Sequence, residues 1–350
     1  MPPFVPGREF ARAFYEEAVA PLLGDTPHSA ALLGWGSEVL GFDTARSTDH
    51  GWGPRLQVFV RGEETPRVRR VIDEGLPDEF HGWATQFGWD EVPVSHQVEV
   101  AAIDDWLRAR LGFDPLQGIA TRDWLTVPQQ ILLEVTRGAV FHDGLGDLTT
   151  AREKLAWYPD EVSLWVTACQ WRRIDQEEPF VGRTAEVGDE LGSRIVAARL
   201  VRDVIRMCFL QERRYAPYSK WLGSAFRELD AFSALGGLLL AVLAAPDYET
   251  REMRLVDVVQ ILAGRHNALG ITAPVDEGVG LFHDRPFRVL GSGRFVDACL
   301  ERVRDPWLRS LPLTGAVDQF VDSTDVLSEP GVFPATTSIF DAWTSETKTA

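Results

Sequence analysis

The chain has 350 residues, of which 45% are hydrophobic, so it is long enough to fold into two domains with full apolar cores. Its formal net charge is -17, which disfavours binding to nucleic acid or to an anionic membrane, because both carry dense negative charge. The three cysteines, Cys169, Cys208 and Cys299, are far apart and odd in number. This usage predicts reduced core residues of a cytoplasmic protein, with no zinc site.

Two apolar segments of the sequence are candidates for membrane-targeting signals, but neither has the features of one. Phe10, Phe14, Ala18 and Leu22 recur at helical spacing, which predicts an amphipathic docking helix instead of a signal peptide. The longest uncharged run, 231–246, is too short to cross a bilayer and predicts a buried helix.

The first hundred residues carry three strand patterns. These are the apolar run 29–35 and the alternating segments 55–60 and 92–102, with a helical pattern at 67–74 between the last two. A small mixed sheet with helices packed on it follows, so this part of the chain is predicted to be an α+β domain over residues 1–118.

The pattern changes to long amphipathic helices after residue 103. A domain that is all α-helical is therefore predicted over residues 119–326, and the Ser-, Thr- and Pro-rich segment 327–350 is predicted to be a loosely ordered tail. The predicted helices are 103–111, 125–137, 162–176, 187–214, 219–243, 251–266 and 293–303.

The most informative residues lie between the first two predicted strands. Gly36 allows close backbone approach to a ligand, and Ser37 follows it where a helix would begin, so free N–H groups there could hold phosphate oxygens. Asp49 lies just before the second strand, and its carboxylate there could bind a divalent metal ion that also contacts the same phosphates.

This order of residues resembles the Pol-beta-like nucleotidyltransferase superfamily. The signature of that superfamily is a Gly-Ser pair after a strand, two acids with one residue between them, and a third acid on a later strand. The longer string Gly36-Ser-Glu-Val-Leu-Gly-Phe-Asp-Thr-Ala-Arg-Ser-Thr-Asp-His50, followed by Trp52-Gly-Pro-Arg55, is similar to an uncharacterised branch, the DUF4037 proteins. So are Gly188-Asp-Glu-Leu-Gly-Ser193 and Tyr215-Ala-Pro-Tyr-Ser-Lys-Trp221, and the resemblance extends over residues 29–322.

The resemblance implies a nucleotidyltransferase-like N-terminal domain and a Mg²⁺-dependent reaction. A nucleoside monophosphate would pass from an NTP, with ATP favoured, to a hydroxyl or amine of an acceptor. Asp49 and Glu99 would be the catalytic residues that hold Mg²⁺, and Glu99 could also act as the base. The nucleotide would be bound by Gly36, Ser37, Arg55 and Lys220. The acidic composition favours a small-molecule acceptor over RNA.

One position departs from the superfamily pattern. The acid expected two residues after Asp49 is replaced by Gly51, whose side chain cannot bind a metal. Either another group such as Asp43 completes the site, or metal-dependent chemistry is lost. The alternatives are a catalytically impaired protein that binds a nucleotide or another ligand, and a nucleotidyltransferase that modifies other proteins. The sequence leaves the oligomeric state open.

Each candidate residue also has an ordinary structural interpretation. Asp49 could cap the turn before the second strand, and Glu99 lies on the polar side of an alternating strand. Arg55 could form a surface ion pair, and Lys220 could extend along a helix surface. An ordinary solvated helix face, instead of a phosphate clamp, is predicted for Arg194, Arg199, Arg202 and Arg206.

Overall fold

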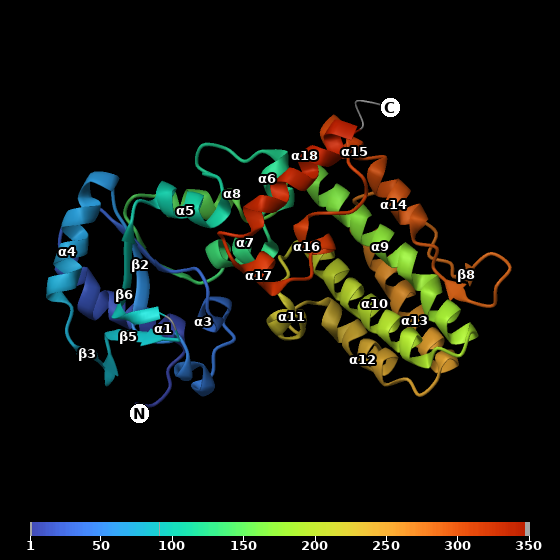
Figure 1. Ribbon diagram of the computed structural model, residues 1–350, viewed down its shortest axis with the longest axis horizontal. Helices are drawn as coiled ribbons and strands as arrows, with labels where there is room; N and C mark the ends of the chain where they lie inside the picture. The colour runs from blue at the N-terminus through green and yellow to red at the C-terminus, as the bar shows by residue number, and fades with distance from the viewer. Residues whose placement is uncertain (1, 91, 347–350) are drawn as a thin grey trace. The chain divides into compact units, whose positions relative to one another are not determined.

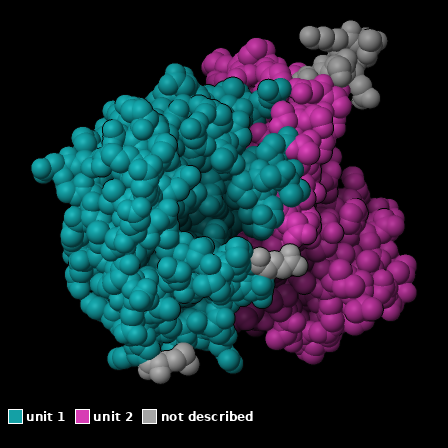
Figure 2. Space-filling model, turned by 60° about the vertical axis from the view of Figure 1, so that its left-hand side comes forward, with its two compact units in different colours: residues 1–123, 130–156, 328–334 teal, residues 124–129, 157–327, 335–350 magenta. Residues whose placement is uncertain are grey.

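The computed structural model describes residues 2–90 and 92–346 (Figure 1). The described chain divides into two compact units, coloured separately in Figure 2. The first unit takes in residues from the ranges 1–123, 130–156 and 328–334, and the second takes in residues from 124–129, 157–327 and 335–350.

The first unit is built around a mixed five-stranded sheet with the strand order β5-β6-β2-β1-β7. Strands β2 and β6 are parallel, and the other neighbouring pairs are antiparallel. The three strands that the sequence predicts are present as β1, β2 and β6, whereas β5 and β7 were not predicted. The strands are β1 (Ser29–Leu32), β2 (Arg55–Phe59), β5 (Gln86–Trp89), β6 (Val92–Ala101) and β7 (Ala139–Asp143).

The two faces of the sheet differ in their covering. One face buries Leu56, Val58 and Val98 against Phe10 and Phe14, and these residues belong to one hydrophobic core. On the opposite face, α5 (Ile103–Leu111) approaches the sheet, and the ring of Trp106 meets that of Phe59 edge-on at 5.4 Å. The remaining elements of this unit are α1 (Gly7–Phe14), a π-helical turn (Tyr15–Val19), α2 (Ala20–Leu23), α3 (Ser37–Leu40), 3-10 turns (Ala45–Asp49 and Gly62–Glu64), α4 (Thr65–Gly75), β3 (Glu79–Phe80), β4 (Trp83–Ala84) and α8 (Asp147–Lys154).

The second unit is helical, which together with the sheet of the first unit confirms the predicted fold class. Its long helices α9 (Asp160–Glu186) and α10 (Glu190–Gln211) are joined by a short loop and pack together, as neighbouring antiparallel helices do. The other elements are α11 (Ser219–Phe226), α12 (Ala231–Ala244), α13 (Tyr248–Ala268), a hairpin of β8 (Gly280–Leu281) and β9 (Arg288–Val289), α14 (Gly293–Leu300), α15 (Pro306–Ser310) and α16 (Val317–Phe320).

Two of the predicted helices are each divided in the structure. The segment 125–137 becomes α6 (Thr121–Thr126) and α7 (Gln129–Thr136), because Pro128 lies between them and lacks the N–H that a continuous helix needs. The segment 219–243 becomes α11 and α12, with a turn at 227–230.

Helical segments also occur where the sequence predicts a loosely ordered tail. The structure has α17 (Thr324–Ser328), a 3-10 turn (Phe333–Thr336) and α18 (Thr337–Glu346). Phe333 and Phe340 are only 1% and 0% exposed, so apolar burial anchors this segment despite its polar composition. Residues 347–350 of the predicted tail lie outside the described residues.

The division into units also differs from a boundary at residue 118. The segment 130–156 returns to the first unit, because β7 pairs with β1 through Ser29 and Asp143. All three cysteines are buried, in agreement with the prediction of core residues. Among residues 2–90 and 92–346, no helix has both the length and the apolar character needed to cross a membrane.

Candidate functional site

The Gly36-Ser37 pair follows β1 and begins α3. Gly36 has a φ of +118°, and a Cβ at this position would lie 2.5 Å from Nη2 of Arg55 and 2.7 Å from Oε2 of Glu38, so only glycine fits. The hydroxyl of Ser37 lies 3.3 Å from that of Ser47. The predicted glycine-serine turn is therefore present, and it lies beside the 3-10 turn that ends at Asp49.

Asp49 is exposed at the end of that 3-10 turn. Within the described parts of the chain, its carboxylate forms no hydrogen bond or ion pair, so it is accessible to a ligand or a cation. The next residue, His50, lies 3.4 Å from the carboxylate of Asp90, and both side chains are exposed. This turn is thus next to the end of β5.

Gly51 is buried and has a φ of +64°. A Cβ at this position would lie 2.8 Å from two ring carbons of Trp35 and 3.3 Å from the ring of Trp89. Real Cβ atoms do not approach a ring at the shorter of these distances, and the backbone conformation favours glycine. The position where the superfamily pattern expects an acid is therefore occupied by a glycine that the packing requires.

Arg55 begins β2 and is committed to partners within the protein. Its guanidinium forms an ion pair of 2.6 Å with Glu38, and both side chains are only 5% exposed. It also donates to the backbone carbonyl of Trp35 at 2.5 Å and lies 4.2 Å from the centre of that ring. Arg55 thus forms a buried ion pair instead of the predicted surface pair, and its phosphate-binding role stays a prediction.

The carboxylate of Asp43, unlike that of Asp49, accepts hydrogen bonds from within the protein. One of its carboxylate oxygens accepts hydrogen bonds from the backbone N–H of Gly7 at 2.7 Å and from the indole N–H of Trp52 at 3.1 Å. This carboxylate therefore ties the beginning of α1 to the loop before β2. In residues 2–90 and 92–346, no three His, Cys, Asp or Glu side chains gather in a way that could hold a metal ion.

Glu99 is exposed on β6, as the alternating pattern of that strand predicts, and lies opposite Gln57 of β2. Its carboxylate accepts hydrogen bonds from the indole N–H of Trp106 at 3.0 Å and from the amide of Gln57 at 3.4 Å. These bonds hold the carboxylate on the face of the sheet that α5 covers.

The side chain of Gln57 connects Glu99 to the segment that leads into the glycine-serine turn. Its amide nitrogen donates to the Glu99 carboxylate at 3.4 Å, and its oxygen accepts the backbone N–H of Leu33 at 2.8 Å. Glu99 therefore lies beside the chain that follows β1. The structure brings Ser37 close to the Asp49 turn, and a metal site shared by Asp49 and Glu99 stays a prediction.

A buried acid near β1 was missed by the sequence interpretation. Glu134 of α7 is 2% exposed and lies 3.2 Å from the guanidinium of Arg110. Burial raises its pKa to about 7, although Arg110 and a hydrogen bond from Gln130 act in the opposite direction. Its backbone carbonyl accepts the N–H of Gly34 at 2.8 Å. The available signal was an acid within the apolar run 131–135.

In the second unit, Lys220 is exposed in the first turn of α11. Its ammonium lies 5.0 Å from the centre of the Trp221 ring. This placement matches the interpretation of a lysine that extends along a helix surface, and a role at a triphosphate stays a prediction.

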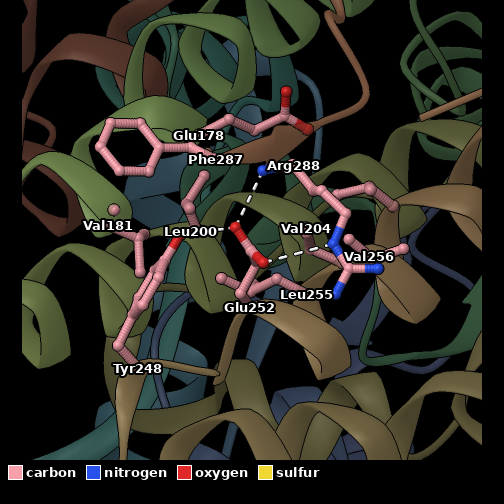
Figure 3. A pocket seen from close by; sticks show the side chains of 12 residues that line it. Glu178, Val181, Leu200, Val204, Tyr248, Glu252, Leu255, Val256, Phe287 and Arg288 are labelled. Carbon is pink, nitrogen blue, oxygen red and sulfur yellow. Dashed lines mark hydrogen bonds and ion pairs between the residues drawn. The ribbon is translucent and has the colours of Figure 1, made fainter. Parts of the chain in front are cut away.

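A small, partly open pocket lies in the helical unit, with its walls formed by α9, α10, α13 and the segment around β9 (Figure 3). The carboxylate of Glu252 accepts the hydroxyl of Tyr248 at 2.5 Å and the backbone N–H of Arg288 at 2.8 Å. Glu178 accepts the backbone N–H groups of Leu290 and Gly291, and burial raises its pKa to about 8. The acids that line this pocket therefore already have donors within the protein.

One family model matches part of the chain. The model of the family described as Domain of unknown function (DUF4037) matches residues 124–222. This range contains the segments 188–193 and 215–221 but not the motif at 36–55. The chain is also similar to the solved structure of a nucleotidyltransferase-like protein from Exiguobacterium sibiricum, with 10% identity and a TM-score of 0.33 over 86% of this chain and 91% of that one. No curated protein matches the chain.

The segment 124–222 that the family model matches includes a cluster of aromatic side chains around Tyr215. The Tyr215 ring lies 5.0 Å from that of Trp157 and 5.2 Å from that of Tyr158. The next residue, Ala216, donates its backbone N–H to the side-chain oxygen of Gln129 at 2.6 Å. These contacts fix the beginning of the segment 215–221 against Gln129 and against residues 157–158, which precede α9, and thereby position the chain that leads to Lys220.

Proposed function

We propose that this protein binds a nucleotide or a related ligand on a nucleotidyltransferase-like scaffold and that its metal-dependent transfer chemistry is impaired. The observation that carries this proposal is the environment of Gly51. The motif resemblance expects a metal-binding acid there, but the residue has a φ of +64° and contacts Trp35 so closely that no side chain fits. A transferase centre of the type that the motif implies would lack one of its bridging carboxylates.

The other acids support the same proposal. The carboxylate of Asp43 already accepts two hydrogen bonds, and that of Glu99 accepts two more, from Trp106 and Gln57. Among the described residues of the motif 36–55, Asp49 has an accessible carboxylate. Two-metal phosphoryl transfer needs several negative ligands around both ions, so acids that already have donors within the protein favour binding over turnover.

A second candidate is a transferase that relies on one Mg²⁺ ion. Mg²⁺ is commonly held by one or two carboxylates together with the phosphates of the substrate. The observation that favours this candidate is the accessible carboxylate of Asp49 beside the hydroxyl groups of Ser37 and Ser47. Asp49 would bind the cation and Ser37 would contact the phosphates, with the acceptor a small molecule or a protein side chain.

Calorimetry with ATP, with and without Mg²⁺, tests the proposal. We expect an ATP dissociation constant that changes by less than about threefold when Mg²⁺ is added, which corresponds to less than about 0.7 kcal/mol. Incubation with labelled ATP and an extract of metabolites and proteins should give no labelled product and no pyrophosphate. ATP binding that requires Mg²⁺, together with labelled product, would establish the transferase instead.

Two variants sharpen this test. Asp49→Ala should leave ATP affinity unchanged in the presence of Mg²⁺, whereas a one-metal transferase would lose both affinity and product. Asp105→Ala is the matched control, because Asp105 is also an exposed aspartate of the first unit but lies on α5. Absence of ATP binding to the unmodified protein under both conditions would reject the nucleotide as the ligand.

A further inference from the structure

Four arginines follow one another along α10 in the helical unit. The first three form ion pairs: Arg194 with Glu190 at 2.8 Å, Arg199 with Glu177 at 2.7 Å, and Arg202 with Asp322 at 2.8 Å. Arg206 is half-buried, and its guanidinium forms no hydrogen bond or ion pair within 4 Å to any part of the chain that the structure describes. The prediction of an ordinary solvated helix face, with ion pairs to nearby acids, therefore fits Arg194, Arg199 and Arg202 but not Arg206.

Arg206 lines a small, partly open pocket that lies within the second unit. Its lining combines an apolar wall with polar side chains. The apolar wall includes Val166, Leu210 and Leu327, and the polar side chains include Arg206, Asp318 and Gln319.

The neighbouring polar side chains are largely satisfied by the protein itself. Both oxygens of Asp318 accept the backbone N–H of Gln129, at 3.2 and 3.1 Å. Gln319 donates to the side-chain oxygen of Gln170 at 3.0 Å, and Gln170 in turn donates to the backbone carbonyl of Asp203. These bonds leave the donors of Arg206 as an unmatched hydrogen-bonding group in the pocket.

The guanidinium of Arg206 is half-buried but still reaches solvent, because none of its nitrogen atoms is among the fully buried polar atoms of the described residues that lack a partner. Burial lowers the pKa of Arg206, and Arg202 and Arg173 act in the same direction, while Asp318 and Asp203 oppose the shift. An arginine keeps its charge in proteins, so the cost of burial is not relieved by loss of a proton. An anion in the pocket would supply acceptors for the guanidinium and offset this cost.

We propose that this pocket binds the carboxylate of a small molecule with a short apolar body, with Arg206 as the residue that pairs with the carboxylate. The planar guanidinium matches a carboxylate through two parallel hydrogen bonds, and the apolar wall accommodates the body. Asp318 lies in the same pocket, and a phosphate with two negative charges would be repelled by it more strongly than a carboxylate with one. The proposal does not depend on the motif at 36–55 or on nucleotide binding.

Ligand-observed NMR titrations at pH 7.5 with butyrate and with butyramide test this proposal. The two probes have the same apolar body and differ in charge. We expect butyrate to bind the unmodified protein at least about tenfold more tightly than butyramide, and Arg206→Met to abolish that difference. Arg206→Lys, which keeps the charge without the planar fork, should retain part of it. Arg199→Met, on the same helix, is the matched control and should bind butyrate as the unmodified protein does.

Thermal unfolding of the same variants separates a binding residue from a structural one. Arg206→Met also removes the cation that lowers the pKa of the buried Asp318 carboxylate, so it should melt at a lower temperature than the unmodified protein. Arg206→Lys keeps a cation there and should melt as the unmodified protein does. A butyrate preference that is fully retained in Arg206→Lys would show that the planar guanidinium is not what pairs with the carboxylate and would overturn the proposal. Binding of butyrate that survives in Arg206→Met, or equal binding of butyrate and butyramide, would overturn it as well. Tighter binding of butyl phosphate than of butyrate would reject the carboxylate as the preferred group.

Discussion

The substitution Gly51→Asp restores the acid that the superfamily pattern expects, and the structure predicts that it destabilises the first unit. Two effects contribute. A non-glycine residue at a φ of +64° costs about 1–2 kcal/mol. A Cβ at 2.8 Å from the Trp35 ring forces side chains or backbone to move, which costs about 1–3 kcal/mol in a packed interior.

The backbone cost of a positive φ lies near the lower end of its range, about 1 kcal/mol, because aspartate tolerates positive φ better than most residues. The total is therefore about 2–4 kcal/mol, which lowers the melting temperature of a unit of this size by roughly 4–16 °C. Circular dichroism during heating and urea unfolding would measure the change. Isothermal titration with Mg²⁺ on the same variant should show no gain in affinity.

Gly112→Asp is the matched control for this experiment. Gly112 has a φ of +81° at the end of α5, but a Cβ there would meet no atom within 4 Å. This variant should lose about 1 kcal/mol of folding free energy, which is the cost of the positive φ alone. If Gly51→Asp is as stable as the unmodified protein and binds Mg²⁺ more tightly, position 51 is a metal site, and the explanation from packing fails.

Three further predictions concern residues in both units. Glu38→Gln should destabilise the first unit by about 3–5 kcal/mol in urea unfolding, because it leaves the buried guanidinium of Arg55 without a carboxylate; a loss below about 1 kcal/mol would contradict this. Burial raises the pKa of Glu178 from 4.5 to about 8, so between pH 4.5 and pH 8 the folded protein holds this proton more tightly than the unfolded chain does. The protonated Glu178 therefore contributes stability at low pH, and this contribution is lost as the pH rises to about 8. Glu178→Gln should flatten the pH dependence of the free energy of unfolding, and an unchanged slope in the variant would exclude Glu178 as the source of that dependence. Lys220→Ala should leave the melting temperature unchanged because Lys220 is exposed, and unchanged ATP affinity in this variant would remove Lys220 from the nucleotide site.

The sequence by itself determined the order of the two kinds of structure and three of the five strands of the main sheet. Those strands were predictable because their apolar residues repeat at the spacing of a strand or form a short apolar run bounded by glycine. Strand β7 was not, because its pairing with β1 brings together Ser29 and Asp143, which are far apart in sequence, and its own side chains are only partly buried. A pattern of neighbouring residues carries no information about which distant segment a strand pairs with.

The candidate site shows the same limit at the level of single residues. The string from Gly36 to Arg55 indicated a glycine-serine turn followed by an accessible acid, and the structure has both features. Only the tertiary structure decided that Arg55 is buried against Glu38 and that Gly51 fits against Trp35. It also distinguished Arg206 from the three other arginines of α10, although all four have the same chemistry and similar helical spacing. The physical reason is that burial and the availability of partners depend on segments distant in sequence, whereas a motif specifies only which groups are present.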